Sequence, residues 1–194
     1  MLANFARFVN ARMLLSLNME NAYTWIELSK IALKNNVGLL NSRAKGQKLV
    51  IPVKGNAYGH GMVEISKMLV EEGIEWLAVT NMNEARELRE EGIQVAIMLL
   101  SSPLQAEYEL VVAYDITMIA HDLDVARGVS ETAIQMNRSV NVHVEIDTGM
   151  SRQGQSTDSI DSFVDELALL PGIEVTGLMT HFATSDELDE SGRS

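Results

Sequence analysis

The chain has 194 residues, enough for one domain with a hydrophobic core or for part of a larger one. Its 46% apolar and 22% charged residues are typical of a soluble globular protein. It has no cysteine, which excludes disulfides and thiolate nucleophiles, and its four histidines lack the spacing of a zinc site. The formal net charge of −12 disfavours nucleic acids and anionic membranes as partners, although a small anionic substrate could still bind beside local cations.

The N-terminal segment has no clear targeting signal. Residues 1–18 contain two arginines and a short apolar patch, Met13-Leu14-Leu15, but no small-residue cleavage site follows that patch. No stretch is long and apolar enough for a transmembrane helix. We therefore predict a cytoplasmic protein in which residues 1–22 form a poorly ordered extension and residues 23–194 form the folded domain.

Helical and strand-like segments alternate along the rest of the chain. Ser29 can cap a first helix, which carries Ile31, Val37 and Leu40 on one side. Strands are predicted at residues 49–53, 76–80, 95–100, 116–120, 140–146 and 174–179, with helices at 62–72, 83–91, 104–112, 123–137 and 158–170.

Two of these helices have further features that can be tested. Gly73 and Gly92 stand just past helix ends, where a left-handed backbone favours glycine. The helix at residues 83–91 is predicted to present a solvated face with charge pairs, formed by Glu84, Arg86, Glu87, Arg89 and Glu90.

The six strand–helix steps have the spacing of right-handed parallel crossovers. Apolar strands of this kind need cover on both sides of the sheet. A doubly wound open sheet and a (β/α)8 TIM-type barrel both fit this pattern. Because six strands do not close a standard barrel, the barrel interpretation predicts an incomplete one, with about the first six βα units.

Reactive residue types follow three of the predicted strands. Lys54 follows the first strand, the segment DTGMSRQG (residues 147–154) follows the fifth, and His181 follows the sixth. In parallel α/β folds the carboxyl ends of the strands gather the functional residues at one edge. The lysine lies in KGNAYGHG (residues 54–61), whose three glycines let the backbone approach a ligand closely. This set of residues suits a covalently bound carbonyl cofactor.

The same segments carry a resemblance to a known family. KGNAYGHG, DTGMSRQG and THFATSDE (residues 180–187) resemble, in order and spacing, three N-terminal signatures of alanine racemase, a fold-type III pyridoxal-phosphate (PLP) enzyme. The segment TWIEL (residues 24–28) resembles the start of that family's barrel. The resemblance implies interconversion of L- and D-alanine, which supplies D-alanine for cell-wall synthesis, in a protein whose full-length form is a homodimer.

The resemblance covers roughly the first half of such a protein. It implies that the last barrel strands, the C-terminal β-domain, the second catalytic base and most of the phosphate site lie beyond residue 194. Because racemisation needs proton removal on one face and proton delivery on the other, this chain alone is expected to have little activity.

The resemblance also implies roles for single residues. Lys54 would hold PLP covalently and act as the base on one face of the substrate. Tyr58 would donate a hydrogen bond to the cofactor phosphate, whereas Asn56 and His60 would brace the turn. Gly55 replaces the alanine that the family usually has at that position.

Two further positions follow from the resemblance. Arg152 would contact the cofactor near its phenolic oxygen and bind the substrate carboxylate, and His181 would pack against the cofactor ring. Glu145 stands where the family often has a lysine thought to be carbamylated, and its charge could position Arg152, so that Glu145→Gln would weaken substrate binding. His121 and His143 match no role in the family and are interpreted as structural, and no residue is assigned to a metal.

Other functions remain open at this point. A racemase for serine or another amino acid would use the same fold. A non-catalytic PLP-binding carrier on a related barrel would lack the second domain, and a truncated, inactive racemase product would show the same motifs. The lysine context of residues 54–61 favours a racemase.

Overall fold

The protein contains a curved, entirely parallel sheet of six strands that pair in the order of the chain. A computed structural model describes residues 25–185 and shows each strand, from β1 to β6, hydrogen-bonded to the next. A doubly wound sheet reverses its strand order at a switch point and does not keep this sequence. The strand order therefore confirms the incomplete (β/α)8 barrel of six βα units, preceded by a helix. The predicted extension, residues 1–22, lies outside the described residues.

All six predicted strands are present, with small changes at their ends. The strands are β1 (Val50–Pro52), β2 (Trp76–Val79), β3 (Ala96–Leu99), β4 (Ile116–Ala120), β5 (Val140–Ile146) and β6 (Ile173–Thr180). The helices are α2 (Lys30–Ala44), α3 (Lys54–Tyr58), α4 (Met62–Glu71), α5 (Met82–Glu90), α6 (Tyr108–Ala113), α7 (Leu123–Gln135) and α8 (Ile160–Ala168). The helix predicted at residues 104–112 is shorter and begins with a 3-10 turn, Gln105–Glu107, and α3 was not predicted. Among the described residues, no helix is long and apolar enough to cross a bilayer.

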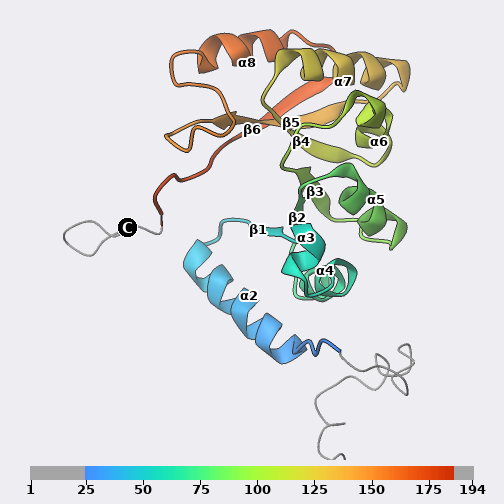
Figure 1. The fold of residues 1–194 in the computed structure, drawn as a ribbon, viewed down its shortest axis with the longest axis vertical. Coiled ribbons are helices and arrows are strands. Elements are labelled where there is room, and N and C mark those ends of the chain that lie inside the picture. The colour runs from blue at the N-terminus through green and yellow to red at the C-terminus, as the bar shows by residue number, and fades with distance from the viewer. Residues whose placement is uncertain (1–24, 186–194) are drawn as a thin grey trace, which may run out of the picture.

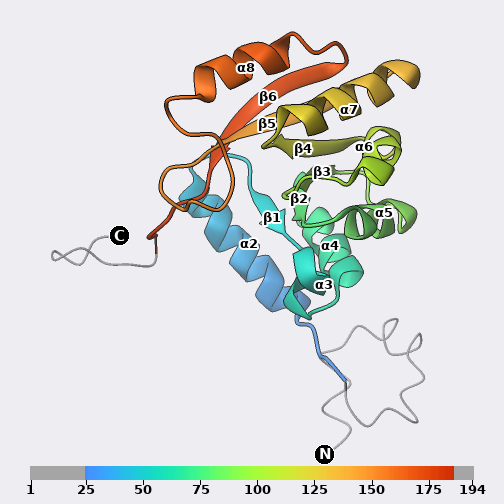
Figure 2. The same cartoon turned by 45° about the horizontal axis from the view of Figure 1, so that its top comes forward.

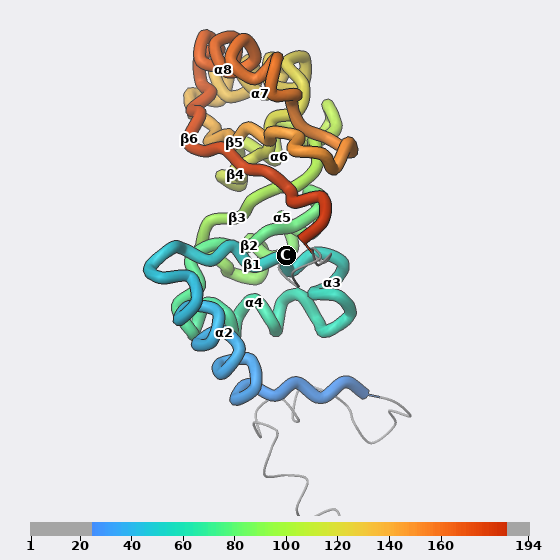
Figure 3. The backbone as a smooth tube through the Cα atoms, turned by 90° about the vertical axis from the view of Figure 1, so that its left-hand side faces the viewer, coloured from blue at the N-terminus to red at the C-terminus, as the bar shows by residue number. Residues whose placement is uncertain are grey.

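The helices α4 to α8 cover the outer side of the sheet (Figures 1 and 2). The inner side carries the smaller of the two core clusters. Alternate strand residues such as Leu77, Ile97 and Val142 point outward and are fully buried against the helices. The intervening residues form a second, inner cluster centred on Ala78, Met98 and Ile119. Figure 3 shows the strands from β1 to β6, with α2 beyond β1 and α7 and α8 beside β6.

The first helix, α2, begins at the predicted cap, and little of its apolar side is buried. The hydroxyl of Ser29 accepts a hydrogen bond from the Ala32 N–H at 3.2 Å, which caps the helix. Of the predicted apolar face, Val37 is buried, but Ile31 and Leu40 are 70% and 46% exposed. These three residues therefore do not form one buried face. Only a narrow part of α2 packs against the sheet layer, and its contact with α4 includes Lys–Glu ion pairs.

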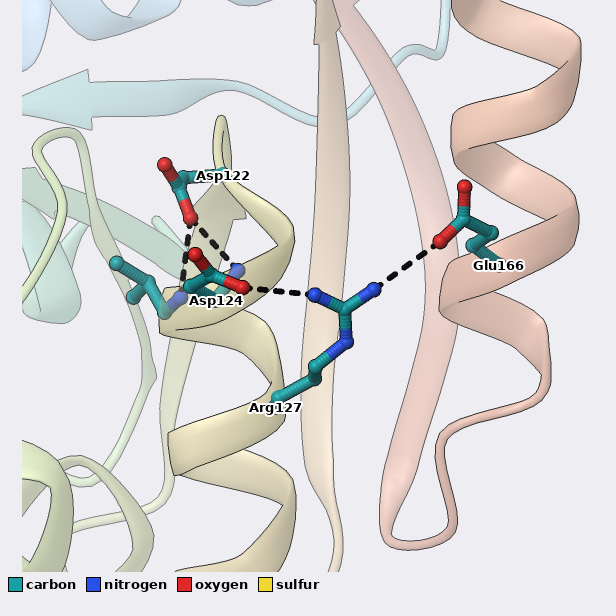
Figure 4. A network of polar contacts seen from close by, with 5 residues as sticks. Asp122, Asp124, Arg127 and Glu166 are labelled. Carbon is teal, nitrogen blue, oxygen red and sulfur yellow. Dashed lines mark hydrogen bonds and ion pairs between the residues drawn. The ribbon is translucent and has the colours of Figure 1, made fainter.

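Charged side chains also join α7 to α8 on the outer surface (Figure 4). The Asp122 carboxylate accepts hydrogen bonds from two backbone N–H groups and so caps α7. Arg127 contacts Asp124 on its own helix at 2.7 Å and Glu166 on α8 at 3.1 Å. Because these groups are exposed, the pairs fix the relative position of the two helices more than they add stability.

The prediction of a purely solvated face on α5 is wrong for Arg89. Its guanidinium turns inward and donates to four backbone carbonyls in the turns that precede β3 and β4. Gly73 and Gly92, by contrast, have the predicted left-handed backbone, with φ of 87° and 84°. The helix thus has an exposed side and one charged side chain that organises the neighbouring turns.

Candidate active site

A cavity of about 730 Å³ lies where the carboxyl ends of the strands meet the inner face of the sheet. Apolar side chains from the inner face, among them Met98 and Met179, form part of its wall. Its polar lining comes from strand ends and loops and consists of Lys54, Tyr58, Thr80, Ser101, His143, Glu145, Arg152, Gln153 and His181. All four residues singled out from the sequence (Lys54, Tyr58, Arg152 and His181) therefore face one cavity, although they come from the ends of three different strands.

Lys54 opens a turn with unusual backbone geometry. The next four residues, Gly55 to Tyr58, have φ values of 61°, 55°, 52° and 54°, so the turn winds in the left-handed sense. A left-handed conformation costs each non-glycine L-residue roughly 1–2 kcal/mol, and three of these four are not glycine. Strain of this kind persists where surrounding contacts enforce it and is common at functional sites. The turn places Lys54 and Tyr58 on the same cavity.

Contacts within the segment hold this turn in place. The N–H of Ala57, which is buried, donates to the Val53 carbonyl at 2.7 Å. The side-chain oxygen of Asn56 accepts from the Met62 N–H at 2.8 Å, which ties the turn to the start of α4. The ring Nδ1 of His60 lies 2.8 Å from the Ala57 carbonyl oxygen. Asn56 and His60 thus brace the turn, as predicted.

Glu84 also supports the turn, which sequence reasoning missed. One carboxylate oxygen accepts from the Gly55 N–H at 2.7 Å and the other accepts from the Thr80 N–H at 2.9 Å. Glu84 therefore connects the end of β1 to the end of β2, rather than lying on a solvated face. The sequence does mark its position in the first turn of α5, where the side chain of Asn81 caps the Glu84 N–H at 3.0 Å.

Lys54 differs from most other lysines of the chain in its surroundings. Four of the six lysines (Lys30, Lys34, Lys48 and Lys67) form ion pairs with glutamates on the outer surface. Lys54 is partly buried and has no ion pair among residues 25–185. An amine that is not held by a carboxylate is free to react with an aldehyde when it is deprotonated.

Arg152 lies on the loop after β5, which we call the Arg152 loop (residues 147–155). The Asp147 carboxylate accepts hydrogen bonds from the Ser151 and Gly149 N–H groups at 3.0 and 2.9 Å. These bonds to the charged form lower the pKa of Asp147, with the Ser151 N–H as the largest cause. The carboxylate thus folds the loop back on itself and keeps Arg152 at the cavity.

Glu145 is buried, but its contacts differ from those expected. Its side chain is 3% exposed, and one carboxylate oxygen accepts from the Gln153 side-chain amide at 2.7 Å. The same oxygen lies 3.5 Å from Nδ1 of His121. Among the described residues, no ion pair joins Glu145 to Arg152, so a direct pairing through which its charge could position Arg152 is absent. The carboxylate contacts the residue next to Arg152 instead.

His143, interpreted from the sequence as structural, also lines the cavity. Its ring lies 5.9 Å from the Trp76 ring, between centroids, and packs over Gly177 on β6. A Cβ atom at position 177 would lie 2.8 Å from two atoms of the imidazole, closer than real contacts allow. The glycine is therefore required for the ring to occupy this position.

We expect Gly177→Ala to displace the His143 ring and destabilise the protein by about 1–3 kcal/mol, because overpacking forces side chains out of position. Urea unfolding measures this loss. Gly38→Ala in α2 is the matched control, since a Cβ there meets nothing within 4 Å, and it should be neutral or slightly stabilising. Equal stabilities of the two variants would contradict the packing described for His143.

Burial lowers the pKa of both His121 and His143 below the ordinary value of 6.5. For His121 the nearby Glu145 carboxylate opposes this effect but does not outweigh it. Both rings are therefore neutral in the folded state at a pH where the unfolded chain already binds protons. Stability is then full above pH 6.5 and falls as the pH drops from 6.5 towards the lowered values.

We expect the unfolding free energy to fall between pH 7.5 and 5.5 with a slope of at most about 1.4 kcal/mol per pH unit for each ring. His143→Phe keeps an aromatic ring over Gly177 but removes one titrating group, so its slope should be shallower. Urea unfolding at several pH values measures both slopes. A variant slope equal to that of the wild type would rule out His143 as a contributor.

Comparison with known proteins identifies the family of this site. Residues 28–193 match the family described as "Alanine racemase, N-terminal domain". The chain belongs to this family. Alanine racemase of Syntrophobacter fumaroxidans is 36% identical over 171 residues, which are 88% of this chain but 46% of that protein. Alanine racemase of Clostridium tetani is 37% identical over 169 residues, 86% of this chain and 43% of that protein. The chain thus spans less than half the length of these relatives.

Solved structures of the alanine racemase family share the fold. An alanine racemase from Clostridium difficile 630, in complex with cycloserine, matches with a TM-score of 0.76 and 33% identity. The match covers 82% of this chain and 44% of that one. A histidine racemase from Leuconostoc mesenteroides has a TM-score of 0.74 at 21% identity, which supports the fold alone. Relatives of this fold therefore include racemases named for two different amino acids.

Proposed function

We propose that this chain supplies the PLP-binding half of an alanine racemase, which interconverts L- and D-alanine and so provides D-alanine for cell-wall synthesis. The observation that carries the proposal is the shared cavity: an amine, a phenol, a guanidinium and an imidazole (Lys54, Tyr58, Arg152 and His181) line it together. Family membership supports the reaction class. Because the chain covers less than half of its relatives, the whole reaction is assigned to the complete protein.

The residues present fit PLP, which carries an aldehyde, a ring and a phosphate. The amine of Lys54 lies at the start of a braced, strained turn and can condense with the aldehyde. The Tyr58 hydroxyl, four residues further along the same turn, can donate to the phosphate. The His181 ring, at the end of β6, can pack against the cofactor ring. PLP, when bound, withdraws electrons from the substrate Cα and so makes its proton acidic.

The remaining steps belong to the residues of the chain. Arg152 binds the substrate carboxylate with its planar fork and so fixes which face of Cα points towards Lys54. The Lys54 amine would take the Cα proton on that face. A second base on the opposite face completes the inversion, and we assign it to the part of the relatives that this chain does not cover. We therefore expect little racemisation by the 194-residue chain alone.

A chemical labelling experiment tests the proposal. The chain is mixed with PLP and then treated with borohydride, which reduces a C=N linkage to a stable secondary amine. Peptide mapping should find the label on Lys54, in contrast to the ion-paired surface lysines such as Lys48. Labelling scattered over the six lysines, or none, would reject the proposal.

Substrate choice is the finer part of the proposal. The apolar wall with Met98, Leu100 and Met179 suits an uncharged side chain, which favours alanine over charged substrates. Racemisation rates of alanine and serine by the complete protein would decide between the two amino acids. A higher kcat/KM for serine would change the assignment but keep the reaction class.

A further inference from the structure

The Arg152 loop is bound to the ends of four strands, which is unusual for a loop of nine residues. The Gln155 side chain donates to the His121 carbonyl after β4 at 2.8 Å. The Gln153 side chain donates to Glu145 on β5 at 2.7 Å and to the Leu100 carbonyl after β3 at 3.3 Å. The side chains of Gln153 and Gln155 thus join the loop to three strand ends.

A contact with β6 completes this set of bonds. The hydroxyl of Thr148 lies 2.7 Å from that of Thr180, the last residue of β6. The Thr180 hydroxyl also donates to the Ile146 carbonyl at 2.8 Å, so the beginning of the loop is fixed to both β5 and β6. His181, which follows Thr180 directly, is thereby kept beside the loop that carries Arg152.

The bond between Glu145 and Gln153 is the most deeply placed of these contacts. Glu145 is 2% exposed, and among the described residues no lysine or arginine lies within 4 Å of its carboxylate. The nearest titrating group is His121, at 3.5 Å, and burial keeps that ring neutral at pH 7. A buried carboxylate needs hydrogen-bond donors, so its bond to the Gln153 amide is charge-assisted and strong.

The backbone at Gly154, between Gln153 and Gln155, is closely packed and has a conformation that favours glycine. Gly154 has φ of 101°, and a Cβ there would lie 3.0 Å from the Asp147 nitrogen and 3.1 Å from the Glu145 carbonyl oxygen. The Asp147 N–H donates to the Gln155 carbonyl and the Gln155 N–H donates to the Glu145 carbonyl, both at 2.8 Å, which closes the loop directly after this glycine. Gln153 thus lies between this closed end of the loop and its neighbour Arg152.

We propose that Glu145 and Gln153 are positioning residues, which hold the Arg152 loop over the cavity through their side-chain hydrogen bond. The proposal rests on the proposed function in one respect, namely that Arg152 contacts the cofactor and binds the substrate carboxylate. It differs from a direct ion pair between Glu145 and Arg152, because here the hydrogen bond to Gln153, rather than charge near Arg152, fixes the loop.

Two substitutions of Glu145 separate the bond from the charge. Glu145→Gln removes the charge but keeps an oxygen that can accept from Gln153, whereas Glu145→Leu removes both. Gln153→Leu breaks the same bond from the other side and leaves the carboxylate in place. Ser66→Ala is the control, since this buried hydroxyl lies on α4 and has no hydrogen-bond partner among residues 25–185.

Hydrogen exchange of the backbone amides measures how well the hydrogen bonds of the Arg152 loop are protected, and it needs no cofactor. We expect the Asp147 and Gln155 amides to exchange about tenfold faster in Glu145→Leu and Gln153→Leu, and less than about threefold faster in Glu145→Gln. Amides of β4 should be unchanged in all three, which distinguishes a local effect from general destabilisation. Unchanged loop exchange in both leucine variants would overturn the proposal, as would an equal effect of Glu145→Gln and Glu145→Leu.

A double-mutant cycle connects the loop to Arg152. The apparent affinity for PLP, measured by borohydride labelling of Lys54, should fall about tenfold in Glu145→Leu and in Arg152→Ala. Adding Glu145→Leu to Arg152→Ala should cause no further loss, because the two act through one contact. Additive losses would overturn the assignment of Glu145 as a positioning residue. If the wild-type chain fails to label at Lys54, the proposed function fails, and the exchange experiment alone decides this inference.

Discussion

Lys54→Ala is expected to reduce covalent capture of PLP by at least about tenfold, to the background of the surface lysines. The reason is structural: Lys54 is the lysine that lines the cavity, and four of the other five are engaged with glutamates. Its amine forms no ion pair among residues 25–185, so its removal should change the unfolding free energy by less than about 0.5 kcal/mol. Intact-mass measurement after borohydride treatment gives the extent of labelling.

Two control variants make this result specific. Lys54→Arg keeps a cation at the start of the turn but cannot form a stable linkage with an aldehyde, so it should label as poorly as the alanine variant. Lys48→Ala removes an exposed lysine paired with Glu75 and should label like the wild type. If Lys54→Ala retained wild-type labelling, the assignment of this cavity to PLP would be wrong.

The fold could be predicted from the sequence because the strand signals are local. Strands such as Ile116–Ala120 and Val140–Ile146 consist of short apolar runs, and the structure has both with the predicted bounds. The sequence left open whether the sheet was doubly wound or barrel-like, since both share the same crossover pattern. The order of the strands in the sheet resolves this point. That order depends on how all the strands assemble rather than on any one segment.

The location of the site could also be predicted from the sequence, but the contacts that support the site could not. Lys54, Arg152 and His181 each follow a strand, and parallel strands bring their carboxyl ends together. The contacts of Glu84 with Gly55 and of Gln153 with Glu145 join residues 29 and 8 positions apart. No periodicity or motif marks such pairs, because they exist only after neighbouring strands have been placed side by side.

The left-handed turn after Lys54 shows the same limit at the level of the backbone. Glycines at positions 55, 59 and 61 indicated a tight segment, and all three have positive φ. Asn56, Ala57 and Tyr58 also have positive φ, against their own preferences. Their conformation is imposed by Glu84, by the start of α4 and by the buried Ala57, which are features of the assembled fold.

Arg89 carries the largest expected effect on stability away from the cavity. Its Nη1 donates to the Ile93 and Val95 carbonyls at 2.8 and 2.7 Å, and its Nε donates to the Tyr114 carbonyl at 2.9 Å. Its Nη2 lies 3.3 Å from the Asp115 carbonyl oxygen. Burial lowers the pKa of Arg89, but a guanidinium stays charged at any pH at which the protein is folded. One side chain therefore donates hydrogen bonds to backbone carbonyls in the turns before both β3 and β4.

We expect Arg89→Met to destabilise the protein by about 2–4 kcal/mol, because the methionine fills the apolar path but leaves those carbonyls without a donor. Arg86→Met on the same helix is the matched control. Arg86 is exposed and makes only a 3.9 Å ion pair with Glu90 and a 3.4 Å contact with Asn83, so its loss should cost less than about 0.5 kcal/mol. Urea unfolding of the two variants at one pH measures the difference. Similar stabilities would mean that water replaces the guanidinium at these turns, and that strand pairing alone holds β3 and β4 in register.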